Sequence, residues 1–281
     1  MIRRFASATA ATAGLALSLT GCLGDAGKEV GENAAKGVRL TAAQVLGRTA
    51  DRAAKADTFT ADMTIDSSAP QAPLKMHVLA QTRLRPEAAM RMTVGSSEVA
   101  GNRIPGYEAR LVGDAMYMRM PALRKATGGK PWAKLSLKQA GGASGIDLGK
   151  LMDQAEQQSP ATQTRMLTAS KDVRKVGTEN VGGVPTTHYA GTMSPREALA
   201  KVDANTRTTL EKTYGQLGAT AIRFDVWVGA DDLPRKHVSV VPLSGGQTTT
   251  TVLYRDYGRP VTVQAPPASQ TGALKMPKLG S

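Results

Sequence analysis

Few residues of this chain have the types and spacing that catalysis or metal binding requires. The three histidines, His77, His188 and His237, are too scattered for a ligand motif such as HExxH, and a single cysteine excludes a multi-cysteine metal site. The sequence carries no GxSxG, SxxK, P-loop or GxGxxG motif. Its one aspartate pair, at residues 231–232, directly precedes a Leu-Pro step and is typical of a turn. We therefore predict a protein that is not an enzyme and that uses no metal and no cofactor, with His188 structural or exposed.

Cys22 ends an N-terminal segment that has the features of a secretory signal. A basic start is followed by an uncharged, Ala- and Leu-rich run over residues 6–19, which is too short to span a bilayer as a mature helix. Leu-Thr-Gly-Cys at residues 19–22 resembles the bacterial lipobox, in which the cysteine becomes the first mature residue and carries acyl chains. We expect residues 1–21 to be a lipoprotein-type signal peptide, and Cys22 to anchor the exported protein to the outer face of the cytoplasmic membrane. The alternative is an ordinary signal peptide that is cut elsewhere.

The chain is basic, with 36 Lys and Arg against 23 Asp and Glu. Removal of the signal takes two arginines and no acid, so the formal net charge falls from +13 to +11. The cations are spread along the chain, and the densest run, at residues 171–175, fits a solvated strand better than a nucleic-acid site. We expect no nucleic-acid partner, whereas attraction to an anionic membrane or glycolipid stays open.

Residues 40–266 form the patterned part of the chain, between a flexible tether over residues 22–39 and a loose tail over residues 267–281. Helical spacing and capping signals predict helices over Thr41–Asp57, Asp147–Gln158 and residues 194–217. Alternating or β-prone segments predict strands at Phe59–Asp66, Leu74–Thr82, Ala88–Val94, Tyr107–Val112, Ala115–Met120, Trp132–Leu137, Val173–Glu179, Val184–Met193, Ala221–Val228, Pro234–Val241 and Thr248–Tyr257.

The order of these elements indicates the fold class. About ten strands, mostly joined by short turns such as Gly113-Asp114, with a few helices between them, predict an antiparallel α+β domain rather than βαβ winding.

The methionines are the most distinctive side chains of the expected sheet. The chain has 12 of them and only 4% aromatic residues. Because alternate residues of a strand share a face, the spacing predicts that several thioethers lie together, and flexible, polarizable methionine accommodates varied apolar shapes. We expect them to line a lipid cavity, with ordinary core packing as the alternative. The candidate lining residues are Met63, Met76, Met90, Met92, Met116, Met118 and Met120.

Three segments carry a family resemblance. Residues 176–189 (VGTENVGGVPTTHY), residues 226–236 (VWVG with the following LPRK) and residues 254–261 (YRDYGRPV) resemble corresponding segments of the actinobacterial LppX/LprG-type lipoproteins. The resemblance covers residues 40–266, with clear motifs in residues 176–266.

The resemblance implies a LolA-like fold, which is a highly curved antiparallel half-barrel with helices covering its concave face. It also implies an apolar cavity and a function in binding and carrying a lipid or glycolipid in the cell envelope. The alternative function is a non-enzymatic envelope module of the same fold that binds a protein partner or senses the cell wall.

Overall fold

The computed structural model describes residues 40–70, 73–99, 101–137, 156, 158–202, 204–243 and 245–274. The chain divides into two units, Met1–Arg39 and Leu40–Ser281, and the second unit has its own buried core. The expected signal peptide, Cys22 and the tether lie outside the described residues, as does most of the expected helix Asp147–Gln158.

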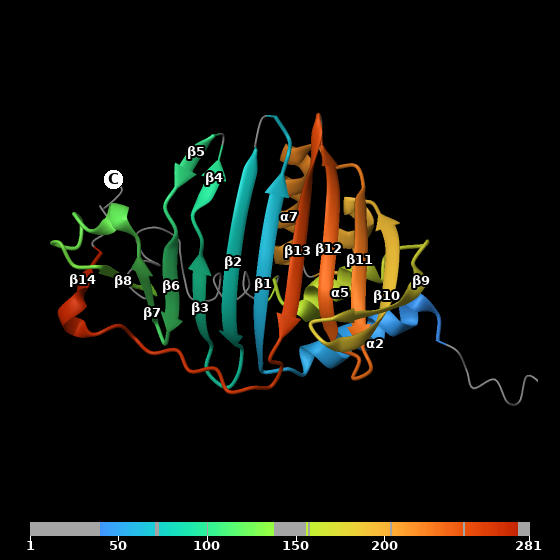
Figure 1. Cartoon of the computed structure of the whole chain (residues 1–281), viewed down its shortest axis with the longest axis horizontal. Coiled ribbons are helices and arrows are strands. Elements are labelled where there is room, and N and C mark those ends of the chain that lie inside the picture. The colour runs from blue at the N-terminus through green and yellow to red at the C-terminus, as the bar shows by residue number, and fades with distance from the viewer. Residues whose placement is uncertain are drawn as a thin grey trace, which may run out of the picture. The chain divides into compact units, whose positions relative to one another are not determined.

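One large, curved and unclosed sheet forms the framework of the second unit (Figure 1). Its strands follow the order β14-β8-β7-β6-β3-β2-β1-β13-β12-β11-β10-β9, with β4 and β5 off this path. All of the pairings are antiparallel except that of β14 with β8. The strands are β1 (Thr58–Ser67), β2 (Leu74–Arg83), β3 (Ala89–Val94), β4 (Ser97–Val99), β5 (Asn102–Ile104), β6 (Tyr107–Val112), β7 (Ala115–Arg119), β8 (Trp132–Ser136), β9 (Arg174–Val181), β10 (Val184–Met193), β11 (Ile222–Gly229), β12 (Pro234–Leu243), β13 (Gly246–Arg255) and β14 (Thr271–Ala273).

The prediction of an antiparallel α+β fold is confirmed, but the predicted number of strands is wrong. The sheet has 14 strands rather than about ten. The strands that were missed, β4, β5 and β14, have three residues each, which is too short for a recognisable alternating pattern.

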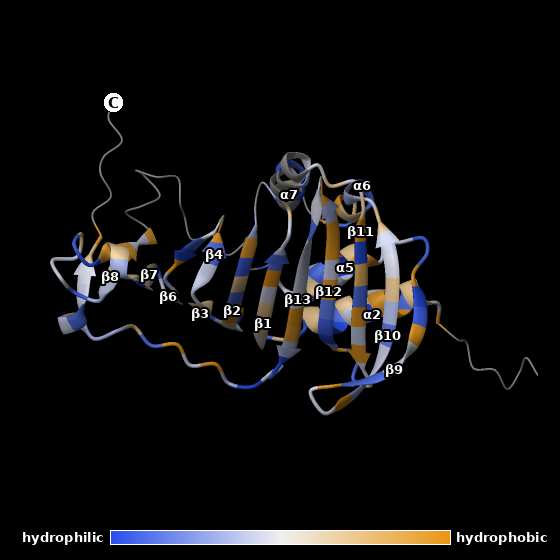
Figure 2. Cartoon of the chain, turned by 45° about the horizontal axis from the view of Figure 1, so that its top comes forward, coloured by the Kyte–Doolittle hydropathy of each residue, from blue (hydrophilic) through white to orange (hydrophobic). Residues whose placement is uncertain are grey.

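The α-helices lie on one face of the sheet, behind strands β13 to β9 (Figures 1 and 2). They are α2 (Ala42–Ala54), α5 (Pro160–Leu167), α6 (Pro195–Leu199) and α7 (Ala204–Leu217), and two short 3-10 helices, η1 (Pro121–Leu123) and η2 (Ala268–Gln270), complete the described elements. The predicted capping boxes are present at Thr41 and Ser194. Helix α5 was not predicted, although Ser159 caps it and Pro160 occupies its first turn.

The prediction of a single helix over residues 194–217 is wrong. The chain leaves the helical conformation after α6 and becomes helical again at α7. The guanidinium group of Arg207 donates hydrogen bonds to the carbonyl oxygens of Leu199 (3.1 Å) and Val202 (3.3 Å). These bonds satisfy carbonyl groups that lose their helical partners at the break.

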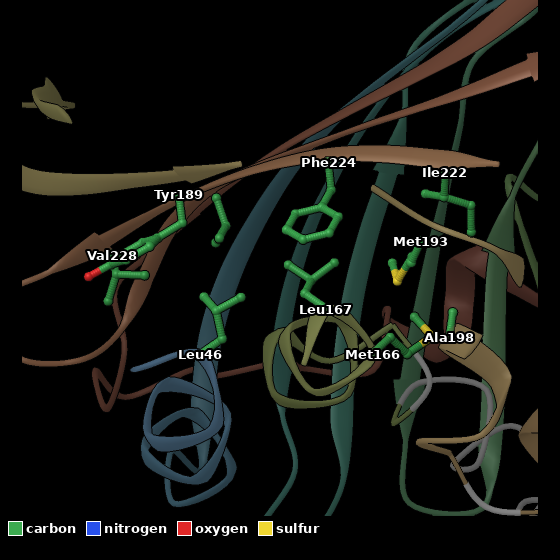
Figure 3. Close-up of a cluster of buried hydrophobic side chains, with 10 residues drawn as sticks. Leu46, Met166, Leu167, Tyr189, Met193, Ala198, Ile222, Phe224 and Val228 are labelled. Carbon is green, nitrogen blue, oxygen red and sulfur yellow. The ribbon is translucent and has the colours of Figure 1, made fainter. Parts of the chain in front are cut away.

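The main core lies between the helices and strands β10 and β11 (Figure 3). Phe224 of β11 points toward Leu167 of α5, and Leu46 of α2 lies on the same side of the sheet. All three side chains are essentially inaccessible to solvent. Burial of each one stabilises the fold by about 1.5–3 kcal/mol.

The chain after β13 crosses the lower ends of several strands before it reaches β14 (Figure 1). Arg83 donates to the carbonyl oxygen of Val261 and Arg110 to that of Gln264, while Val261 and Val263 are buried against β3. Residues 268–273, within the segment expected to be a loose tail, form η2 and β14, and residues from 275 onward lie outside the described part.

Replacement of Gly191 by alanine should destabilise the main core. A Cβ atom at this position of β10 would lie 2.7 Å from Phe224 Cζ and 2.7 Å from Ser170 Oγ. Such overpacking typically costs about 1–3 kcal/mol, which urea denaturation would measure as a lower free energy of unfolding. Gly177→Ala on β9 is the matched control, because nothing lies within 4 Å of its added Cβ. Equal losses in the two variants would contradict this account.

Candidate functional site

A cavity of about 320 Å³ lies on the face of the sheet that carries the helices, next to α5. This volume is at the lower end of the range for small-molecule pockets. Its walls come from seven strands, β12, β13, β1, β2, β3, β6 and β7, and from residues at the start of α5. The lining residues are Phe59, Ala61, Met63, Val78, Ala80, Thr82, Met90, Met92, Leu111, Met116, Gln158, Gln163, His237, Ser239, Thr250, Val252 and Tyr254.

The register of the strands brings the apolar lining together. Met63 on β1 lies opposite Val78 on β2 and Val252 on β13, and Met90 on β3 lies opposite Leu111 on β6. Small side chains, such as the paired Ala61 and Ala80, leave the space between these larger ones. The cavity therefore results from the alternation of long, flexible side chains with alanines on one face of the sheet.

Four of the seven candidate methionines, Met63, Met90, Met92 and Met116, line this cavity. Met76, Met118 and Met120 are not among the lining residues. Met76 lies on the correct face of β2 but beyond Val78, toward the other end of the strand, and Met118 lies beyond Met116 on β7. Met120 follows the end of β7 and precedes η1, so strand alternation no longer determines its direction.

One wall of the cavity is polar, and sequence reasoning did not find it. His237 and Ser239 project from β12, Thr250 from β13, and Gln158 and Gln163 from the region of α5. None of the described lining residues is charged at neutral pH, because His237 is held neutral. The cavity therefore combines an apolar wall of methionines with a wall of uncharged polar groups.

His237 is the most unusual residue of this wall. Its side chain is 8% exposed, and its Nε2 atom is buried without a hydrogen-bond partner among the described residues. Burial lowers the pKa of His237 from 6.5 to about 4, against an opposing effect of the Asp225 carboxylate. The imidazole is therefore neutral at physiological pH and offers one donor and one acceptor.

His188 belongs to a polar cluster on the opposite face of the sheet. Its Nδ1 atom lies 3.0 Å from Glu179 Oε1 and its Nε2 atom 2.7 Å from Asp225 Oδ1. The imidazole stacks on Trp227 at 4.2 Å, and the indole N–H donates to Glu179 Oε2. These contacts join β9, β10 and β11, so His188 is structural, and Asp231-Asp232 forms the predicted turn between β11 and β12.

A second polar cluster, around Glu108 on β6, was not predicted. Its buried carboxylate lies 2.7–2.9 Å from the guanidinium groups of Arg91, Arg110 and Arg119. Burial alone would raise the pKa of Glu108, but its hydrogen bond from Arg110 and the three positive charges lower it below the ordinary value. Arg110 and Arg119 also lie over the ring of Trp132. The described residues contain no group of three or more acidic, histidine or cysteine side chains that would hold a metal ion.

Comparison with solved structures identifies the fold. LprF from Mycobacterium bovis aligns over 80% of this chain and 96% of its own, with a TM-score of 0.52 and 14% identity. The chain has the LolA-like fold of LprF. LppX from Mycobacterium tuberculosis aligns over 79% of this chain and 98% of its own, but its TM-score of 0.44 and 12% identity permit no conclusion. The structural expectation from the family resemblance is thus confirmed at the level of the fold.

Two streptomycete proteins are similar in sequence. An uncharacterised 31.2 kDa protein of Streptomyces griseus, from the rplA-rplJ intergenic region, is 37% identical over 60% of this chain. A Streptomyces coelicolor protein, provisionally named a lipoprotein, is 33% identical over 60% of this chain. The chain spans only about half the length of these relatives, 56% and 51%. No family model matches the chain, and no described helix is long and apolar enough to cross a membrane.

The buried histidine should make stability depend on pH in a defined window. Above pH 6.5 neither the folded nor the unfolded chain protonates His237, whereas between pH 6.5 and about 4 only the unfolded chain does. The stability of the wild-type protein should therefore fall with decreasing pH, by about 3 kcal/mol relative to His237→Leu. Urea denaturation of both proteins between pH 8 and 4 measures this difference, and parallel profiles would show that His237 titrates normally.

Proposed function

We propose that this protein is an exported envelope lipoprotein of the LppX/LprG type that binds the acyl part of a lipid or glycolipid in the cavity beside α5. The observation that carries the proposal is a cavity of about 320 Å³ lined by Met63, Met90, Met92 and Met116, with no charged side chain among its described lining residues. An acyl chain in this cavity would gain about 25 cal/mol for each Å² of apolar surface removed from water. Methionine would adjust to chains of different length or branching.

Binding fits the residues of the cavity better than catalysis does. His237 and Ser239 both line the cavity, but His237 Nε2 makes no hydrogen bond among the described residues, whereas the base of a nucleophilic pair is hydrogen-bonded to its hydroxyl. Carriage of a lipid also requires release, which a flexible apolar lining without charged anchors favours. We propose that the protein carries or presents a lipid without changing it chemically.

The proposed membrane location rests on the N-terminal sequence. We propose that the signal peptide, residues 1–21, is removed and that acylated Cys22 holds the protein on the outer face of the cytoplasmic membrane. The streptomycete relative that is named a lipoprotein supports this proposal. Residues 22–39 would then tether the folded unit, with its formal charge of +11, near the anionic lipid surface.

The proposed lipid should be found in the purified protein. Leu40–Ser281 purified from an actinobacterial host should contain an acyl lipid that solvent extraction and mass spectrometry detect. Ala80→Phe should remove most of it, because Ala80 lies between Ala61 on β1 and Met92 on β3 and the ring would fill the space beside them. Gln81→Phe, at the next position of β2 and on the opposite face, is the matched control and should retain the lipid.

A wild-type protein without lipid, or equal lipid in the two variants, would refute lipid binding in this cavity. The first of these results would favour the alternative of a module that binds a protein partner.

The proposed membrane anchor, acylated Cys22, can be tested separately. Cys22→Ala in the full chain should move the protein from the membrane fraction to the soluble fraction, because acyl chains supply about 0.8 kcal/mol per buried methylene group. Immunoblotting of fractionated cells measures the distribution. Cys22→Ala protein that stays with the membrane would show that acylation is not its anchor.

A further inference from the structure

Exposed basic side chains gather on the β8 side of the sheet, away from the α-helices (Figure 1). Strand β7, strand β8 and the loop that joins them contain five cations and no acid. Strand β3 adds one more exposed arginine to the same side of the sheet. We call these six residues the cationic surface: Arg91, Arg119, Arg124, Lys125, Lys130 and Lys134.

The register of the strands brings charges of the cationic surface side by side. The residues before and after Arg91 on β3 line the cavity, so Arg91 itself projects from the other face of the sheet. Arg91 lies opposite Arg110 on β6. Tyr117 on β7 is next in this row, and Lys134 on β8 lies opposite it. One row across four strands therefore carries three cations.

Glu108 compensates for only part of this charge. Its buried carboxylate lies 2.7–2.9 Å from the guanidinium groups of Arg91, Arg110 and Arg119. Like charges on neighbouring strands destabilise a sheet, and the carboxylate reduces that cost. Three cations around one anion still leave this cluster with a formal charge of +2, and Arg91 and Arg119 stay 47% and 57% exposed.

The loop between β7 and β8 has a fixed backbone and exposed charges. The buried Thr127 Oγ1 lies 2.6 Å from the carbonyl oxygen of Lys130 and 2.9 Å from that of Arg124. Gly272 of β14 packs so closely on Thr127 that an added Cβ would lie 2.5 Å from its carbonyl oxygen. The side chains of Arg124 and Lys125 are exposed and form no ion pair within the described part of the chain.

Elsewhere on this face of the sheet, cations have acidic neighbours. His77 and Arg255 lie 2.7 Å and 3.6 Å from the carboxylate of Asp62. Lys75 on β2 lies opposite Asp66 on β1. The excess of cations over acids is therefore a local property of the β8 side, in addition to the basic composition of the whole chain.

Beyond the lipid binding proposed above, we propose that the cationic surface binds the anionic headgroup layer of the membrane. The local excess of exposed cations is complementary in charge to such a layer. Because the Debye length at physiological ionic strength is about 8 Å, only cations close to the lipids contribute. The place where cations gather therefore determines which surface faces the membrane. This inference rests on the proposed membrane location and not on the cavity.

The shape of the cationic surface suits an extended anionic layer better than a single small anion. Its cations are exposed, and they extend over a loop and across three strand spacings, about 14 Å. Binding through the strand face would leave the opposite face, which carries the helices and the cavity, turned away from the bilayer. Since salt screens this attraction, it would orient a protein that acyl chains already hold.

Sedimentation of Leu40–Ser281 with lipid vesicles tests the inference, because this fragment lacks Cys22 and hence the proposed acyl anchor. We expect binding to vesicles of phosphatidylglycerol and phosphatidylcholine in equal parts, and none to phosphatidylcholine alone. Each cation near an anionic surface contributes about 1 kcal/mol, or about five-fold in affinity. The triple variant Arg124→Gln, Lys125→Gln, Lys134→Gln should therefore bind about 100-fold more weakly.

The matched control removes three exposed cations from other parts of the unit. Arg174→Gln and Lys175→Gln on β9, combined with Lys212→Gln on α7, lower the net charge by the same amount. This variant should retain most of the vesicle binding. All six side chains are exposed, so both triple variants should fold as the wild-type protein does. Equal losses in the two variants would show that net charge alone attracts the protein, and would overturn the inference.

Salt and a soluble polyanion complete the test. Vesicle binding should disappear between 0.1 and 1 M NaCl, as the Debye length falls from about 10 Å to about 3 Å. Binding that survives 1 M NaCl would contradict an electrostatic contact. Binding to soluble polyphosphate but not to anionic vesicles would assign the surface to a different partner and refute membrane binding. Wild-type protein that binds no vesicles would also refute it, while lipid binding in the cavity and the Cys22 anchor would stand.

Discussion

The structure depends on how the apolar face of an open sheet is kept from water. Along each strand, alternation sends one set of side chains to the face that carries the helices, and over strands β10 and β11 this face packs on α2 and α5 through Phe224, Leu46 and Leu167. The same apolar face continues over β1, β2 and β3, beyond the contacts of that core. There methionines and alanines, together with Phe59, Val78 and Thr82, enclose free volume instead of a packed layer. The same face of the sheet is thus packed against helices over β10 and β11 and lines a cavity over β1, β2 and β3.

The two clusters of charged groups lie on the other face of the sheet. Three arginines surround the buried carboxylate of Glu108, and two carboxylates hold the imidazole of His188. The clusters join neighbouring strands, and the side chains of Arg91 and Arg119 stay about half exposed. On the apolar face, His237 is an imidazole whose buried Nε2 atom has no hydrogen-bond partner among the described residues.

A lining of methionines suits binding that must be reversible. Rigid aromatic rings would define one shape, whereas unbranched thioethers adjust to several at little cost. The chain contains few aromatic side chains, and of the described lining residues Phe59 and Tyr254 carry phenyl or phenol rings, which pack edge to face.

The sequence by itself determined the local structure. Alternation located eleven strands, capping residues located the starts of α2 and α6, and the Gly113-Asp114 turn located a hairpin, because each depends on residues close together in the chain. Strands of three residues and the break between α6 and α7 carry no such signal. Only the tertiary structure decided which methionines meet, because β1 pairs with β13 across almost two hundred residues and the register sets each neighbour. The two histidines lie on opposite faces of the sheet, because the face of each one follows from the register of its strand with its neighbours.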